Sequence, residues 1–124
     1  MKILSVKQFS NKFKVTVQST GRLNFTEETT KILGISEDTF VKFGIEDNDL
    51  YLAILREKDE DAFEVRKSGS YYYVPTKALF DALDINYKRD TTLSYNMLRA
   101  ENMDVEMGGQ TFRLVENNKE MNPM

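Results

Sequence analysis

The side chains that could do chemistry in this chain are carboxylates, amines, guanidinium groups and hydroxyls, because its 124 residues include no cysteine and no histidine. Disulfides, thiolate nucleophiles, the usual zinc sites and catalytic pairs built on histidine are therefore excluded. Glu57, Asp59, Glu60 and Asp61 lack the glycine and the ligand spacing of a calcium loop, so a solvated linker is the favoured interpretation there. No carboxylates stand in a recognisable acid–base motif. We expect no enzyme, no cofactor, no metal and no small-molecule substrate.

Basic and acidic side chains are segregated along the chain, although the net charge is only −3. Residues 1–36 hold six Lys or Arg against two Asp or Glu, whereas residues 37–61 hold three against nine. Residues 62–90 return to five against four. This pattern is typical of a protein with one basic face for a polyanion. Chance blocks of charge on an ordinary soluble surface would give the same counts.

The length fits one domain, or two very small ones that share a core. No apolar run is long enough to span a bilayer, and the apolar stretch near the start is too short for a signal peptide and is interrupted by Lys7. We therefore expect a cytoplasmic protein that does not bind membranes.

The elements that must position any site begin with a repeated pattern between residues 13 and 55. Apolar residues alternate over residues 13–17, which predicts a half-buried strand, and Gly21 is suited to a tight turn. Thr26 is a good helix N-cap, and Gly34 is the natural left-handed stop of that helix. We expect Ile32, Leu33 and Ile35 to supply its buried side.

A hairpin follows the helix. Residues 40–45 and 50–55 form two apolar runs around Asp47 and Asn48, which favour a tight turn. Both faces of the second run are apolar, so this strand should be covered on both sides. Residues 2–6 contain a further candidate edge strand.

A second unit starts at Phe63 and repeats this layout more loosely. Gly69 repeats the turn, and in the strand that follows Tyr71 and Tyr73 point to one face and Tyr72 to the other. Pro75 fits the first turn of a helix. The apolar stripe of this predicted helix consists of Ala78, Leu79, Ala82, Leu83 and Ile85.

The second unit ends in a longer hairpin than the first. Residues 93–97 alternate, Met103, Val105 and Met107 alternate again, and Gly108-Gly109 is a strong turn signal. We therefore predict a first unit over residues 1–57, a second unit over residues 62–116 and a disordered tail over residues 117–124.

The ordered motifs resemble the AbrB/MazE/SpoVT superfamily of swapped-hairpin DNA-binding domains. The first unit carries the matching residues Ser19, Gly21, Arg22, Leu33, Gly34 and Ile35, with Thr26 in place of the family's proline. The second unit carries Val65, Arg66, Lys67, Ser68, Gly69 and Pro75, with Leu83-Asp84-Ile85 in place of Leu-Gly-Ile. Two tandem copies in one chain are similar in layout to the MraZ proteins, although the acidic-arginine helix signature of those proteins is absent.

The resemblance implies a mainly β fold with short helices, in which tandem AbrB-like units form a swapped-hairpin β-barrel. It implies that the two arginine-tipped turns lie side by side and that basic side chains there contact double-stranded DNA, as in a transcriptional regulator. The residues expected to contact DNA are Lys12, Lys14, Arg22, Arg66 and Lys67. Lys77, Lys88 and Arg89 are weaker candidates. Arginine can fork to a phosphate or to a guanine edge, whereas lysine mostly supplies point charge.

Two alternatives remain open. The same fold could be a protein-interaction or homodimerisation module, with exposed aromatic residues and a methionine-rich face of Met97, Met103 and Met107, unless these methionines fill the core. The tyrosines of residues 71–73 could instead stack bases of a single-stranded nucleic acid. Ordinary β-propensity and core packing also explain a tyrosine run.

Overall fold

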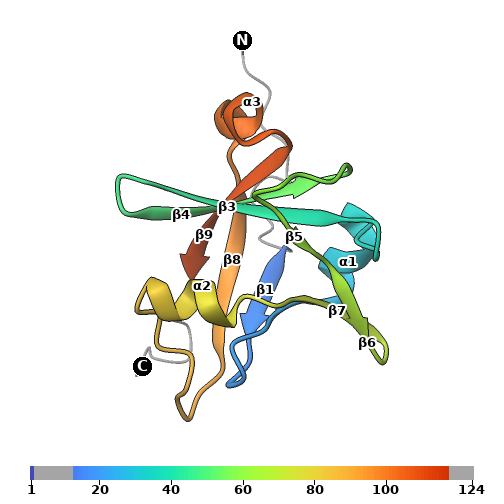
Figure 1. The fold of residues 1–124 in the computed structure, drawn as a ribbon. Helices are drawn as coiled ribbons and strands as arrows, with labels where there is room; N and C mark the ends of the chain where they lie inside the picture. Colours follow the sequence, from blue (N-terminus) through green and yellow to red (C-terminus); the bar gives the residue numbers. More distant parts are fainter. Residues whose placement is uncertain (2–12, 118–124) are drawn as a thin grey trace.

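The computed structural model describes Met1 and residues 13–117, and these form a mainly β fold with short helices, as predicted (Figure 1). Nine antiparallel strands make one sheet in the order β5-β3-β4-β9-β8-β1-β2-β7-β6. In the described part, no helix has the length and apolar content needed to cross a bilayer. The predicted edge strand over residues 2–6 and most of the predicted tail lie outside the described residues.

The elements follow one another along the chain with the following bounds. The first half consists of β1 (Lys14–Val17), β2 (Leu23–Phe25), α1 (Glu27–Leu33), β3 (Phe40–Glu46) and β4 (Asp49–Leu55). The second half consists of β5 (Phe63–Glu64), β6 (Arg66–Ser68), β7 (Tyr71–Val74), α2 (Lys77–Ala82), β8 (Leu93–Arg99), the 3-10 turn η2 (Glu101–Met103), α3 (Asp104–Met107) and β9 (Gln110–Glu116).

The sheet is a nearly closed barrel, because its two end strands are consecutive in the chain. β5 pairs with β3 at one end of the strand order, and β6 pairs with β7 at the other. Val65 lies between β5 and β6, is buried, and donates its N–H to the Thr39 carbonyl at 3.1 Å. One residue therefore carries the chain from one end of the sheet to the other.

The strand pairings are unchanged when the two halves are exchanged. β1 pairs with β8, and the corresponding strands β5 and β3 pair in the same way. β2 pairs with its counterpart β7, and β4 pairs with its counterpart β9. Each half thus completes its part of the barrel with strands of the other half, so neither half encloses a core alone.

The helices begin and end for local reasons. The Thr26 hydroxyl accepts the Thr29 N–H at 3.3 Å, and Gly34 ends α1 in the left-handed conformation, as predicted. Leu33 and Ile35 are buried, as predicted, whereas Ile32 is 55% exposed, so its expected burial was wrong. Pro75 lies before the start of α2 rather than in its first turn. The predicted apolar stripe is confirmed in part, because Leu79 and Ile85 pack against the core, but the fully buried residue of α2 is Phe80.

Strand β4 has apolar neighbours on both faces, as predicted. Leu52 and Ile54 belong to the main core inside the barrel. Ala53 and Leu55 face a second cluster, which contains Met103 and Met107. The predicted hairpin joins β3 to β4 and turns at Asp47 and Asn48, which both have positive φ.

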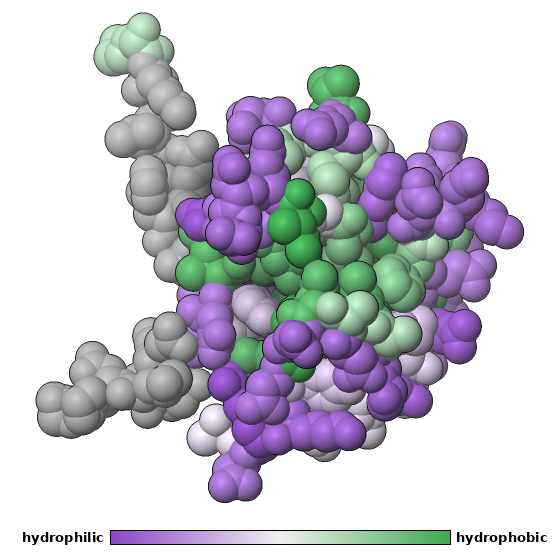
Figure 2. Space-filling view, turned by 60° about the vertical axis from the view of Figure 1, so that its left-hand side comes forward, coloured by the Kyte–Doolittle hydropathy of each residue, from purple (hydrophilic) through white to green (hydrophobic). Residues whose placement is uncertain are grey.

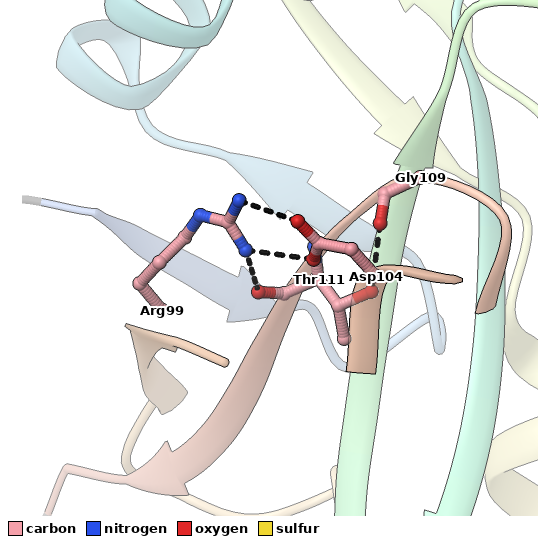
Figure 3. A network of polar contacts seen from close by, with 4 residues as sticks. All are labelled: Arg99, Asp104, Gly109 and Thr111. Atoms are coloured by element: carbon pink, nitrogen blue, oxygen red, sulfur yellow. Dashed lines mark hydrogen bonds and ion pairs between the residues drawn. The ribbon is translucent and has the colours of Figure 1, made fainter. Parts of the chain in front are cut away.

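The segment that covers the outer face of β4 is helical, so the alternating strand predicted over residues 103–107 was wrong. Met103 and Met107 stand four residues apart on one helical face and are buried, whereas Val105 between them is 96% exposed. Figure 3 shows the polar contacts that hold this segment: Arg99 donates to both carboxylate oxygens of Asp104 at 2.8 and 2.7 Å, and Asp104 also accepts the Thr111 N–H.

Candidate nucleic-acid interface

A row of polar side chains crosses the outside of five neighbouring strands. Residues directly opposite one another on paired strands share a face of the sheet. The register therefore places in one row, from β6 to β8, the residues Arg66, Tyr73, Asn24, Thr16 and Ser94. The adjacent row contains Val74, Leu23, Val17 and Leu93, which are all buried in the core. The first row consequently lies on the outer face of the barrel.

The two arginines with the strongest sequence case are both neighbours of Tyr73, a residue of this row. The Arg22 guanidinium carbon lies 4.1 Å from the centroid of the Tyr73 ring, which is a cation–π contact. Arg66 is the direct cross-strand neighbour of Tyr73 on its other side. Arg22 is half-buried and Arg66 is exposed. Arg22 and Arg66 therefore lie on either side of Tyr73 on one face of the sheet, although they come from different halves of the chain.

The expected lysines are distributed differently. Lys14 lies on the outer face of β1, two residues from Thr16, and is half-buried. Lys67 lies on the face of β6 opposite to Arg66, with its amine 5.7 Å from the centroid of the Tyr72 ring. Lys12 lies outside the described residues. The β6–β7 hairpin thus carries one cation on each of its faces.

The remaining arginines are all engaged within the protein. Arg89, Arg99 and Arg113 form ion pairs with Glu116, Asp104 and Asp49, respectively. Arg56 donates to the carbonyls of Leu33 and Gly34 at the end of α1. Among the described residues, neither Arg22 nor Arg66 has a carboxylate partner. The chain's six arginines are therefore divided into four with internal roles and two that are available to a ligand.

The weaker basic candidates are largely neutralised. The Lys77 amine lies 2.9 Å from Asp81, and this hydrogen bond raises the pKa of Lys77. The pKa of Asp81 is lowered, first by the hydrogen bond from the Tyr87 hydroxyl and then by the bond from Lys77. Arg89 is paired with Glu116 at 2.9 Å. Lys88 is exposed on the loop before β8. These residues add little net positive charge to the outer face.

The two glycine turns do not lie side by side, which corrects the sequence-based expectation. β2 and β7 run antiparallel, with Leu23 opposite Val74, so the turn before β2 and the turn before β7 are at opposite ends of this strand pair. The Thr76 hydroxyl donates to the Gly21 carbonyl at 2.8 Å. A Cβ on Gly21 would lie 2.8 Å from the Cβ of Lys77. Arg22 and Arg66 are brought near each other by the pairing of β2, β7 and β6 rather than by the turns. The first turn is packed against α2.

A hollow of about 610 Å³ borders the outer row. It lies between residues 16–20 and residues 87–92, and Thr16 belongs to both the hollow and the row. Its lining is rich in hydroxyl groups. Buried polar atoms also occur on the outer face itself, where the side-chain oxygens of Asn24 and Asn96 have no hydrogen-bond partner. The outer face is thus polar as well as basic.

The methionine-rich face expected for an interaction module is absent from the described surface. Met97, Met103 and Met107 are 2%, 8% and 7% exposed, so they fill the cores. An apolar patch exists elsewhere: Figure 2 shows hydrophobic residues gathered in the middle of the face that carries the β3–β4 hairpin and α2. The most exposed large apolar residue of that hairpin is Ile45, at 57%.

Sequence reasoning singled out both arginines but did not place Tyr73 between them. Alternation already assigns Tyr73 to the face opposite Tyr72, and Tyr72 packs against the core, as expected for core packing. The missing information was the partner strand, which decides that Tyr73 stands between Arg66 and Asn24. Comparisons do not add to this description, since no model of a known protein family, no curated protein and no solved structure matches the chain.

Proposed function

We propose that this chain binds double-stranded DNA as a small, cytoplasmic regulator of transcription of the AbrB-like type. The observation that carries the proposal is the division of the arginines. Arg22 and Arg66 flank one tyrosine on the outer face, and the other four arginines bind carboxylates or backbone carbonyls of the protein itself. An arginine without a carboxylate partner keeps its full charge for a phosphate.

Charge on the surrounding surface supports this function. The outward positions of the described strands β8, β1, β2, β7 and β6, together with Arg22 just before β2, carry Ser94, Asn96, Leu98, Lys14, Thr16, Arg22, Asn24, Tyr71, Tyr73, Arg66 and Ser68. None of these is acidic, although the whole chain has a net charge of −3. Local cations that neutralise phosphates release condensed counterions, which supplies most of the affinity of non-specific DNA binding.

The stacking of Arg22 on Tyr73 favours duplex binding over single-strand stacking. A tyrosine platform binds single strands by presenting free ring faces to bases. Here the Tyr73 ring is contacted by Arg22, Tyr72 packs against the core, and Tyr71 is 38% exposed. A cation–π contact orients the guanidinium without neutralising it. The tyrosines therefore serve as supports for basic groups.

The family assignment is supported by the pairing pattern. A barrel in which each half pairs its strands with the other half is what tandem AbrB-like units with swapped hairpins require. The symmetric pairs β2–β7 and β4–β9 and the equivalent pairs β1–β8 and β5–β3 meet this requirement. Arg22 then occupies the Ser-x-Gly-Arg position of the family pattern.

The test is the salt dependence of affinity for a fluorescent duplex, measured by anisotropy with the full chain. We expect the logarithm of the binding constant to fall linearly with the logarithm of salt concentration. Arg66→Ala should reduce this slope by about one. Lys58→Ala removes the same charge from an exposed site in the linker and should leave the slope unchanged. A slope of zero for the native chain would refute the proposal.

A further inference from the structure

We propose that strand β3 binds an extended segment of another protein along its open edge, as an added strand in which a basic residue stands between two apolar ones. This docking site does not depend on DNA binding, because β3 is not one of the strands that carry the outer row of polar residues. Its features are unpaired backbone groups, an exposed apolar side chain and carboxylates without cations.

Strand β3 has a partner along its whole length on one side and along only two residues on the other. β4 pairs with all seven residues of β3. β5 pairs with Phe40 and Val41 and no further. The chain enters β5 from a turn in which the Ala62 N–H bonds to the Asp59 carbonyl at 3.0 Å, so the chain leaves the sheet at this point. Residues 43–46 therefore form an open edge of the nearly closed barrel.

The backbone groups of Phe43 and Ile45 point toward this open side. In an antiparallel sheet, successive residues present their N–H and C=O groups to opposite neighbours. The Thr39 carbonyl accepts the Val65 N–H on the β5 side, so alternate residues of β3 from Thr39 onward face that side. Within residues 13–117, no hydrogen bond reaches the backbone of Phe43 or Ile45 from there. Their N–H and C=O groups are available to an added strand, which is how sheet edges bind extended peptides.

The side chains on the inner face of this edge are apolar and incompletely covered. The Phe43 ring packs edge-to-face against Phe63 and Phe80, at centroid distances of 5.7 and 6.1 Å. Ile45 lies on the same face two residues further along and is 57% exposed. Figure 2 shows apolar side chains gathered on the face that carries this hairpin, framed by hydrophilic ones. Residues of an added strand that pair with Phe43 and Ile45 would lie on this face, so they should be apolar.

The outer face of the same edge has the opposite character. Gly44, between Phe43 and Ile45, borders a hollow of about 210 Å³ whose lining includes Glu46 and Glu106. Both carboxylates are exposed, and neither has an ion-pair partner among the described residues. A residue opposite Gly44 on an added strand would point its side chain outward beside this hollow. A lysine or arginine at that position would meet two carboxylates.

The charge around the edge favours a basic occupant over a second copy of this chain. Residues 37–61 include nine acidic and three basic side chains. Of the basic ones, Lys42 pairs with Asp59 at 3.6 Å, and Arg56 donates to backbone carbonyls at the end of α1. Two copies joined through β3 would bring two acidic hairpins together, and like charges repel. The occupant that fits therefore has the order apolar, basic, apolar at three successive residues.

The test uses the full chain and a synthetic peptide, acetyl-Thr-Ile-Lys-Ile-Thr-amide, with residue-resolved hydrogen exchange as the measurement. At a peptide concentration about ten times its dissociation constant, we expect exchange of the Phe43 and Ile45 N–H groups to slow by about tenfold, because only the unbound fraction exchanges freely. The Gly44 N–H faces β4 and is the internal control, which should change less. Peptides with glutamate in place of lysine, or with both isoleucines N-methylated, should not protect these groups.

Two matched substitutions provide the second arm. Ile45→Lys removes apolar surface from the edge and adds a charge that repels the peptide, so it should weaken binding by about tenfold or more. Ile32→Lys is the control, because Ile32 is 55% exposed on α1 and should leave binding unchanged.

Protection of Phe43 and Ile45 in the free chain would mean that the chain itself fills the edge. Protection that rises with protein concentration would mean that a second copy fills it. Either result would overturn the proposal, as would stronger binding of the glutamate peptide or the absence of any peptide-dependent protection.

Discussion

At the residue scale, α1 and α2 are followed by the same left-handed backbone conformation, but the residue that adopts it is a glycine after α1 and an aspartate after α2. Gly34 and Asp84 have φ values of 65° and 57°, and the next residues, Ile35 and Ile85, donate to equivalent carbonyls of their helices. Glycine adopts this left-handed conformation without steric cost, whereas a Cβ makes it unfavourable. We expect Asp84→Gly to be more stable than Asp84→Ala by about 1 kcal/mol, measured by urea unfolding.

A matched pair of substitutions at Ala78 controls for the identity of the new residue. Ala78 is exposed in α2, where glycine should lower the free energy of unfolding by about 0.5–1 kcal/mol relative to alanine. The sign of the glycine–alanine difference should therefore reverse between positions 78 and 84. Equal stabilities at position 84 would show that the left-handed backbone there costs nothing.

The residue scale also shows what the sequence could supply of the candidate site. Arg22 and Arg66 could be selected from their types and their positions beside glycine turns. Their common neighbour Tyr73 could not, because alternation reports which residues of one strand share a face and carries no information on the neighbouring strand. Lys67 is a different case, since alternation alone already places it on the face of β6 opposite to Arg66.

At the element scale, α3 shows how a short alternating pattern can mislead. Met103, Val105 and Met107 have the spacing of a strand, but helical geometry places residues four apart on one face and turns the middle residue outward. Met107 contacts the second cluster with Leu55 and Ala53, and Val105 is exposed. We expect Met107→Ala to lower the free energy of unfolding by about 2–3 kcal/mol. Val105→Ala, the control, should change it by less than about 0.5 kcal/mol. Similar losses at both positions would contradict this arrangement.

The ion pair that fixes α3 should make stability depend on pH. The Arg99 hydrogen bonds hold the pKa of Asp104 below its ordinary value of 3.8. Because the folded form binds this proton less readily than the unfolded form, the contribution is present above about pH 4 and is lost as the pH falls through the lowered pKa. The difference in unfolding free energy between the native chain and Asp104→Asn should therefore shrink in acid. Urea unfolding at several pH values measures this difference, and a pH-independent difference would exclude a role for the carboxylate charge. The pKa of Asp81 is lowered as well, but Asp81 is present in both proteins, so its pH-dependent contribution cancels in this difference.

At the scale of the whole molecule, the sequence predicts the parts of the fold better than their assembly. The repeated strand, turn, helix and hairpin could be read twice because each depends on nearby residues such as Thr26 and Asn48. The pairing of β1 with β8 joins residues that are about 80 positions apart in the chain, and no local pattern predicts it. Antiparallel pairing of β2 with β7 then separated the two turns that the sequence had suggested were neighbours.

This assembly predicts how the chain behaves when it is divided. Among residues 13–117, four of the eight strand pairings join one half to the other, and the cut can be placed in the exposed linker at Lys58 without touching a strand. A fragment of residues 1–58 therefore loses one partner of each of the strands β1, β2, β3 and β4, and much of its apolar surface is left exposed to water. We expect fragments 1–58 and 59–124 to show weak β-sheet circular dichroism when monomeric and to recover the native spectrum when mixed. The mixture should sediment with the mass of one complete chain. Two fragments that each fold as monomers, with full native spectra and no association, would mean that the shared sheet is not what stabilises the protein.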